Sequence, residues 1–110
     1  MQATNLTRLR RSSLAVLAAA LLPAAGWAQD GTWARSLAAT CANCHGTNGN
    51  ARGDMKPLAG LPAARIVAQL NDFKAGVGSP TVMHQIAKGY TEAQVQAIAA
   101  YFEAQKPAGK

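Results

Sequence analysis

Two cysteines and a histidine lie close together in the sequence: Cys41, Cys44 and His45, in the pattern Cys-x-x-Cys-His. This pattern is the attachment signature of covalently bound haem c. Two thiols at this spacing can each add across one vinyl group of a haem, because the chain between them makes a single turn. The neighbouring imidazole can then bind the iron from one side. The sequence therefore predicts one covalent haem on Cys41 and Cys44, with His45 as an axial ligand of the iron.

Three other kinds of chemistry use the same residues and stay open at this point. A thioredoxin-like redox pair needs a βαβ context, which the sequence does not show. A disulfide between Cys41 and Cys44 would close a loop too short to add much stability. A zinc ion could use both cysteines together with His45 and His84, although two adjacent residues suit one tetrahedral centre poorly. The motif favours haem over all three.

The second axial ligand of the iron must come from elsewhere in the chain. The candidates are Met55, Met83, His84 and the lysines. Met83 lies far beyond His45, after a whole predicted helix, so the chain has room to reach the opposite face of a haem. Met55 follows His45 much more closely, within the same loop. We expect Met83 as the ligand, with Met55 and His84 as alternatives. A thioether ligand raises the reduction potential of the iron, and a second histidine lowers it.

The segments that must position these residues have helical patterns. Residues 30–40 start with a capping residue, Asp30 or Thr32, and run into the haem motif. A polar, glycine-rich stretch follows at residues 46–54 and favours a loop. A second helix is predicted from Pro62 to Gly76, with the apolar positions Ile66, Leu70 and Phe73 on one face.

Two further helices are predicted in the C-terminal part. Residues 81–88 form a short helical segment, which Gly89 can close at positive φ. The last helix starts at Thr91, which forms a capping-box pattern with Gln94. No segment alternates between apolar and polar residues for long enough to predict a strand. The sequence therefore predicts an all-α domain of three main helices plus one short helix around the haem, with a core that includes Trp33, Leu37, Phe73, Ile98 and Phe102.

Residues 1–28 have the three parts of a secretory signal peptide. Three arginines precede an apolar run at residues 14–22, and small residues precede Gln29. We expect cleavage before Gln29 and export to the periplasm. Residues 29–110 then form one monohaem domain. No apolar stretch of the chain is long enough to cross a bilayer, so we expect no membrane span after cleavage.

The charge of the predicted mature domain is mildly basic. Three of the eleven lysines and arginines lie in the leader, which leaves eight basic against five acidic residues. This balance is too mild and too evenly spread to favour nucleic-acid binding. It suits a soluble protein with an acidic partner.

The arrangement of these motifs resembles the class I cytochromes c, with haem attachment near the mature N-terminus and a methionine towards the C-terminus. Within that family the chain is most similar to the cytochrome subunit of flavocytochrome c sulfide dehydrogenase. The similar segments are Cys-x-x-Cys-His-Gly, 57–60, 73–76, 81–83 and 86–90. The resemblance implies that Met83 is the second axial ligand. It also implies that the carbonyl of a loop proline, here Pro57, accepts the Nδ1 hydrogen of His45.

A fully coordinated haem iron exchanges single electrons and binds no substrate, which predicts a periplasmic electron carrier. The resemblance implies a role as the electron-accepting subunit of a sulfide dehydrogenase, with a flavoprotein (FAD) partner and a downstream soluble acceptor. Sulfide oxidation would then occur at the flavin, and this chain would be non-catalytic. Two alternatives remain: a free-standing soluble carrier for another oxidoreductase, and a haem gas sensor or peroxidase with an open iron position.

Overall fold

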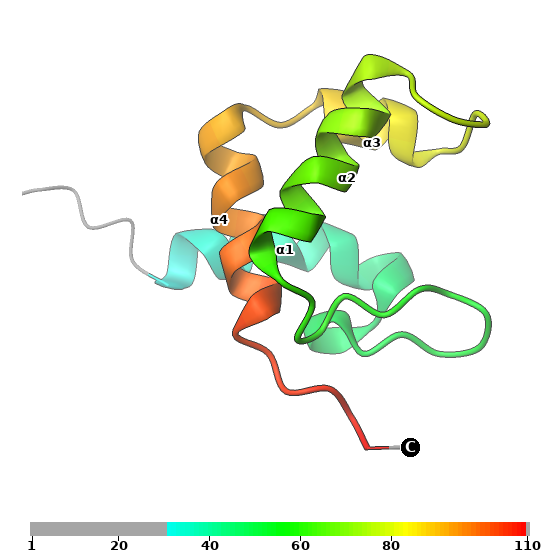
Figure 1. Ribbon diagram of the computed structural model, residues 1–110. Coiled ribbons are helices and arrows are strands. Elements are labelled where there is room, and N and C mark those ends of the chain that lie inside the picture. Colours follow the sequence, from blue (N-terminus) through cyan, green and yellow to red (C-terminus); the bar gives the residue numbers. More distant parts are fainter. Residues whose placement is uncertain (1–30, 110) are drawn as a thin grey trace, which may run out of the picture.

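The computed structural model describes residues 31–109, and all of its regular structure is helical. The elements are α1 (Gly31–His45), the 3-10 turn η1 (Thr47–Gly49), α2 (Ala63–Ala75), α3 (Met83–Lys88) and α4 (Glu92–Glu103). The described residues contain no β-strand (Figure 1). The predicted all-α fold of three main helices and one short helix is therefore confirmed. The predicted signal peptide and its cleavage site lie outside the described residues.

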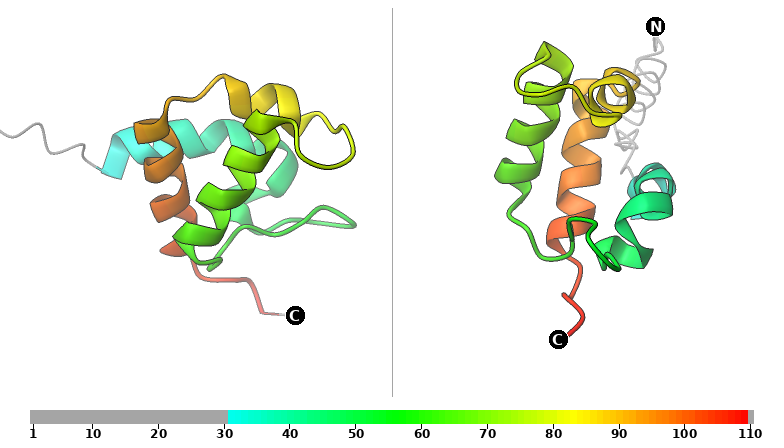
Figure 2. Two further views of the ribbon diagram at one scale, coloured as in Figure 1. Left: turned by 45° about the horizontal axis from the view of Figure 1, so that its top comes forward. Right: turned by 90° about the vertical axis from the view of Figure 1, so that its right-hand side faces the viewer.

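Helix α4 occupies the centre of the fold. It packs against α1 on one side and α2 on the other, and α3 packs against α2 (Figure 2, right). The buried apolar cluster joins all four helices and comprises Ala38, Ile66, Leu70, Ala87, Val95, Ile98, Ala99 and Phe102. Helices α1 and α3, which carry the predicted ligands, make no extended contact with each other. The two predicted ligand-bearing helices are thus held relative to each other mainly through α4 and α2.

The local sequence explains why α4 can serve as this centre. Its first turn is closed by the predicted capping box, in which the side chains of Thr91 and Gln94 each accept a hydrogen bond from the other residue's backbone N–H. Its apolar stripe is entirely buried, and Val95 and Phe102 have no exposed surface. Burial of a side chain the size of phenylalanine contributes about 1.5–3 kcal/mol.

Two helix ends differ in detail from the sequence-based expectation. Gly76 ends α2 in the left-handed conformation, with φ 77°, as the sequence indicates. Gly89, expected at positive φ, has φ −75° instead. The chain leaves α3 through a turn in which the Gly89 N–H donates to the carbonyl of Ile86 at 3.1 Å, and this turn needs no left-handed residue.

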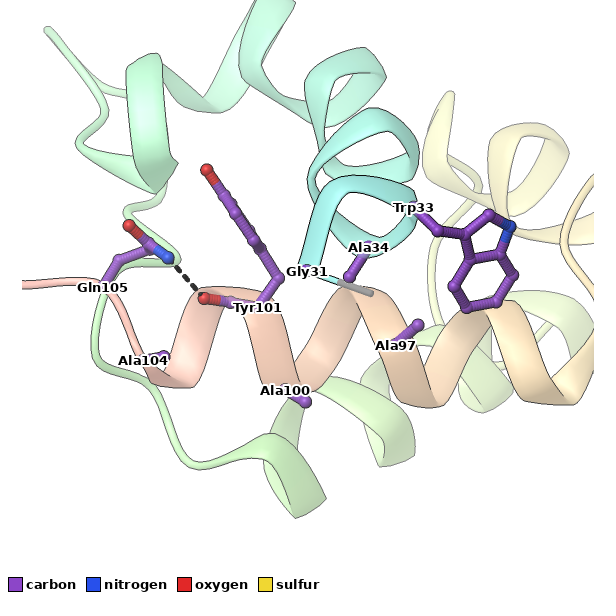
Figure 3. Close-up of a pocket in the computed structure, with 8 residues that line it drawn as sticks. All are labelled: Gly31, Trp33, Ala34, Ala97, Ala100, Tyr101, Ala104 and Gln105. Atoms are coloured by element: carbon purple, nitrogen blue, oxygen red, sulfur yellow. Dashed lines mark hydrogen bonds between the residues drawn. The ribbon is translucent and has the colours of Figure 1, made fainter. Parts of the chain in front are cut away.

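The predicted core position of Trp33 is wrong. Leu37 and Phe73 are half-buried against the core, whereas Trp33 is half-buried outside it. It lies in the first turn of α1, in an open groove of about 390 Å³ between α1 and α4 (Figure 3). The α4 residues that face this groove include Ala97 and Ala100, which are too small to enclose an indole ring.

None of the described helices has the length and apolar character needed to cross a membrane.

Candidate functional site

The haem motif forms the last turn of α1. The sequence instead predicts a helix that ends at residue 40, directly before the motif. The first residue that breaks the helix is Gly46, with φ 80°, where a Cβ atom would clash with the carbonyl group of Asn50. Residues three apart share one face of a helix, so the helical turn brings the thiols of Cys41 and Cys44 to the same side. Both cysteines are free, Cys41 half-buried and Cys44 exposed.

The surroundings of Cys41 disfavour the thiolate form of its side chain. Burial raises the pKa of this thiol, and a hydrogen bond with the Thr40 side chain opposes the shift only in part. Thioether formation adds S–H across a carbon–carbon double bond. The half-buried thiol of Cys41 packs against the core, a position that suits attachment of an apolar ring system.

The orientation of His45 is fixed from the loop that follows α1. Its Nδ1 lies 2.7 Å from the carbonyl oxygen of Lys56. Donation from Nδ1 to a carbonyl leaves the Nε2 lone pair available for a metal. Nε2 makes no hydrogen bond to the part of the chain that the structure describes. The imidazole is thus set up as a ligand through Nε2.

The carbonyl that His45 contacts is not the one that the family resemblance implied. It belongs to Lys56 and not to Pro57. The proline ring restricts the residue before it to extended backbone, so Pro57 still influences where the Lys56 carbonyl points.

Close backbone contacts hold this loop, residues 46–60, in place. The N–H groups of Leu58 and Ala59 both donate to the carbonyl of Gly49, at 2.8 and 3.1 Å. A Cβ atom on Gly49 would lie 2.7 Å from the nitrogen of Ala59 and 2.8 Å from Cδ1 of Phe102, so only glycine fits. The Gly60 N–H donates to the carbonyl of Phe102 at 2.8 Å, which fastens the loop to the end of α4.

The side chain of Asn50 connects the same loop to the segment that follows α4. Its amide nitrogen donates to the carbonyl of Lys106 at 3.2 Å, and its amide oxygen accepts the N–H of Ala108. The loop that orients His45 is therefore bonded both to α4 and to the residues after it.

The two candidate methionines have different surroundings. Met83 is the first residue of α3, and its side chain is half-buried against the core. Met55 is 45% exposed, on the outside of the loop. A thioether must reach inward to meet an apolar ring system, and the position of Met83 suits this role better.

His84, a candidate iron or zinc ligand in the sequence, is occupied by other contacts. The residue is buried, with 7% of its surface exposed. Nδ1 accepts the Thr81 N–H at 3.1 Å, and Nε2 lies 2.9 Å from the carbonyl oxygen of Val77. Neither nitrogen is free for a metal. The described residues also contain no group of three or more His, Cys, Asp or Glu side chains that could hold a metal ion, which speaks against the zinc alternative.

The donor set as a whole fits haem c. Two free thiols lie on one helical face beside an imidazole with a free Nε2, and a half-buried thioether is carried by a different helix. Three large apolar side chains of the segment that leads into α3 and of α3 itself are exposed: Val77 (56%), Val82 (68%) and Ile86 (40%). An exposed apolar surface of this kind suits contact with an apolar cofactor.

This helical fold around a Cys-x-x-Cys-His motif defines a class I c-type cytochrome. The family model for subunit III of cbb3-type cytochrome c oxidase matches residues 28–102. The chain therefore belongs to this family of cytochrome c domains. It carries haem c and functions in electron transport.

Several curated proteins are similar to the chain. The thiosulfate dehydrogenase electron acceptor of Thiomonas intermedia is 41% identical over 99 residues, which cover 86% of this chain and 46% of the relative. The cytochrome subunit of sulfide dehydrogenase of Chlorobaculum tepidum is 42% identical over 66 residues, 60% of each protein. Cytochrome c-552 of Acidithiobacillus ferridurans is 43% identical over 61 residues, 56% of this chain and 26% of the relative. The chain thus spans less than two thirds of the length of each of these relatives.

Proposed function

We propose that this chain is the electron-accepting cytochrome of a periplasmic sulfide dehydrogenase, and that it takes electrons one at a time from an FAD-containing partner subunit. The observation that carries this proposal is the naming of two of the relatives that are more than 40% identical to the chain. One is named as a cytochrome subunit of sulfide dehydrogenase and the other as an electron acceptor of thiosulfate dehydrogenase. Both names associate the relative with a dehydrogenase that acts on an inorganic sulfur compound.

Four residues are proposed to hold the cofactor. Cys41 and Cys44 form the two thioether bonds, and Nε2 of His45 and the sulfur of Met83 bind the iron. The contact of His45 with Lys56, the position of Met83 against the core and the engagement of both nitrogens of His84 support this assignment. Haem c supplies one-electron exchange without a bond to substrate.

The residues of the chain then set the conditions for electron transfer. In this assignment His45 and Met83 would both bind the iron, which would leave no coordination position open for a substrate. The thioether of Met83 would favour reduced iron and raise the reduction potential, which suits an electron acceptor. Oxidation of hydrosulfide to zero-valent sulfur releases one proton and two electrons. A flavin can accept both electrons, and two successive encounters with this one-electron carrier remove them.

The test is sulfide-dependent reduction of the haem-loaded chain, followed by its absorption spectrum, with and without the candidate flavoprotein. We expect fast reduction only when the flavoprotein is present. Equal rates without it, or no reduction with it, would contradict the sulfide dehydrogenase role. A parallel assay with thiosulfate and a thiosulfate dehydrogenase tests the second candidate function, which the relative from Thiomonas intermedia favours.

The compartment is part of the same proposal. Residues 1–28 act as the signal peptide, and the mature protein starts at Gln29 in the periplasm. N-terminal sequencing of the exported, haem-loaded protein tests this start. Carbon monoxide binding by the reduced protein tests the alternative of an open iron position, and we expect none while Met83 is bound.

A further inference from the structure

The turn between α2 and α3 leads directly to Met83. Residues 78–80 of this turn, Gly78, Ser79 and Pro80, are exposed and make no hydrogen bond within the described chain. A turn of this kind does not fix the start of the next helix by itself. The side chain of His84 contacts both ends of this turn, Val77 and Thr81.

We propose that His84 is a positioning residue, which clamps the turn from Val77 to Thr81 and so holds the thioether of Met83 at the iron. This inference rests on the proposed ligation by Met83. It gives His84, the alternative ligand in the sequence, a different role beside the same site.

The hydrogen bonds of His84 define the clamp. Nδ1 accepts the backbone N–H of Thr81 at 3.1 Å, so this nitrogen carries no hydrogen. Nε2 must then carry the ring hydrogen, and it faces the carbonyl oxygen of Val77 at 2.9 Å. The hydroxyl group of Thr81 also lies 3.3 Å from Nδ1. One ring therefore joins the residue that enters the turn to the residue that leaves it.

Packing against α2 holds the His84 ring in place. The residue is 7% exposed, and its ring meets Phe73 of α2 edge-on, with 5.1 Å between ring centroids. The two hydrogen bonds of the ring are partly shielded from water, so breaking them costs more than breaking fully exposed bonds. The clamp consequently ties the turn to the packed interface of α2 and α3.

The clamp acts on Met83 through the backbone. The Met83 N–H donates to the side-chain oxygen of Thr81 at 3.2 Å, and Met83 immediately precedes His84. The position of Thr81 thus determines where the first turn of α3 lies, and this turn carries the Met83 side chain. Loss of the clamp frees the turn and lets Met83 leave the iron more often, while the core made by α4 stays unchanged.

The experiment measures how easily an external ligand displaces the thioether. Imidazole is titrated into the oxidised holoprotein, and the near-infrared sulfur-to-iron band reports bound Met83. His84→Phe keeps the ring and its contact with Phe73 but removes both hydrogen bonds. We expect imidazole to bind this variant about tenfold more tightly than the wild type, since two lost bonds weaken the thioether-bound state by about 1.4 kcal/mol. His84→Asn can keep the Thr81 bond only, and we expect an intermediate affinity.

A matched control separates positioning from general stability. Glu103→Ala at the end of α4 removes the side-chain acceptor of the Ala63 N–H, at the opposite end of α2 from the turn, and it lowers the free energy of unfolding. We expect its imidazole affinity to equal that of the wild type. A wild-type affinity in His84→Phe, or the same increase in Glu103→Ala, would overturn the clamp.

A measurement on the wild-type holoprotein tests the clamp without depending on whether a variant folds. Hydrogen exchange by NMR should show a Thr81 amide that is protected although its residue is exposed, and the ring nitrogens of His84 should show hydrogen on Nε2. A Thr81 amide that exchanges as fast as that of Ser79 would overturn the clamp. Absence of the sulfur-to-iron band from the wild type would instead overturn the ligation by Met83, and the clamp's role at the iron with it.

Discussion

The hydroxyl groups of Thr40 and Tyr90 lie 2.5 Å apart, although the two residues are 50 positions apart in the sequence. Thr40 directly precedes Cys41, and Tyr90 lies between α3 and α4. The Thr40 hydroxyl also lies 2.9 Å from the carbonyl of Leu37, to which it donates, so Tyr90 is the donor in the contact between the two. This bond joins the cysteine-bearing end of α1 to the chain that leaves α3.

Removal of this bond should cost little stability but should be measurable. Tyr90→Phe deletes only the hydroxyl group, and we expect the free energy of unfolding of the holoprotein to fall by about 1 kcal/mol. Thr40→Val should give a similar loss. Denaturant unfolding of both single variants and the double variant measures the coupling between them. Simple addition of the two losses would show that the bond contributes nothing.

Loss of both cysteines should prevent folding of the domain. The buried core formed by the four helices is small, and a domain of this size needs an additional stabilising device. We expect Cys41→Ala combined with Cys44→Ala to give a colourless chain without a cooperative unfolding transition. Absorption spectra and calorimetry measure both properties. A colourless variant that still melts cooperatively would show that the protein core suffices.

The two methionines should respond differently to substitution. Met83→Ala should abolish the sulfur-to-iron band, lower the reduction potential and allow carbon monoxide to bind the reduced protein. Met55→Leu, at the exposed loop position, should change none of these properties. Spectroscopy and potentiometry distinguish the two variants. The reverse pattern would assign the ligand to Met55.

Two glycines of the His45 loop provide a matched pair of substitutions. Both have positive φ, 77° for Gly49 and 61° for Gly53. A Cβ atom on Gly53 meets nothing within 4 Å, so Gly53→Ala should cost only the conformational penalty of roughly 1–2 kcal/mol.

Gly49→Ala should cost clearly more, because its Cβ atom would meet Ala59 and Phe102 at less than 3 Å. We expect a loss of about 3 kcal/mol or more, together with a changed ligand environment of His45 in the NMR spectrum of the holoprotein. Denaturant unfolding measures the stabilities. Equal losses in the two variants would mean that the loop relaxes around the new methyl group.

Signals that are local in the sequence predicted their elements well. The capping box at Thr91 and the glycine at position 76 mark real helix ends, because each acts through neighbouring backbone groups. The haem motif is equally local. By contrast, the half-exposed position of Trp33 depends on the small alanines of a distant helix, which periodicity within one segment does not reveal.

The parts of the site that were missed depend on contacts between segments. The acceptor for His45 is the carbonyl of Lys56, and a backbone carbonyl leaves no residue-type signal in a sequence. His84 could be proposed as a metal ligand from its type alone. Its actual partners are backbone groups of a turn, Val77 and Thr81, which only the folded chain brings to both nitrogens.

The bonds from the His45 loop to Phe102, Lys106 and Ala108 have a consequence for the order of folding. Asn50 and Ala108 are 58 positions apart, so the loop cannot close around these partners until the chain up to Ala108 is present. Contacts of such long range form late, because a long segment must first be ordered. The cysteine turn of α1, which is local, can form early. During biogenesis the thiols are therefore presented before the imidazole of His45 is locked, and the final orientation of His45 is a late event that depends on residues 106–108.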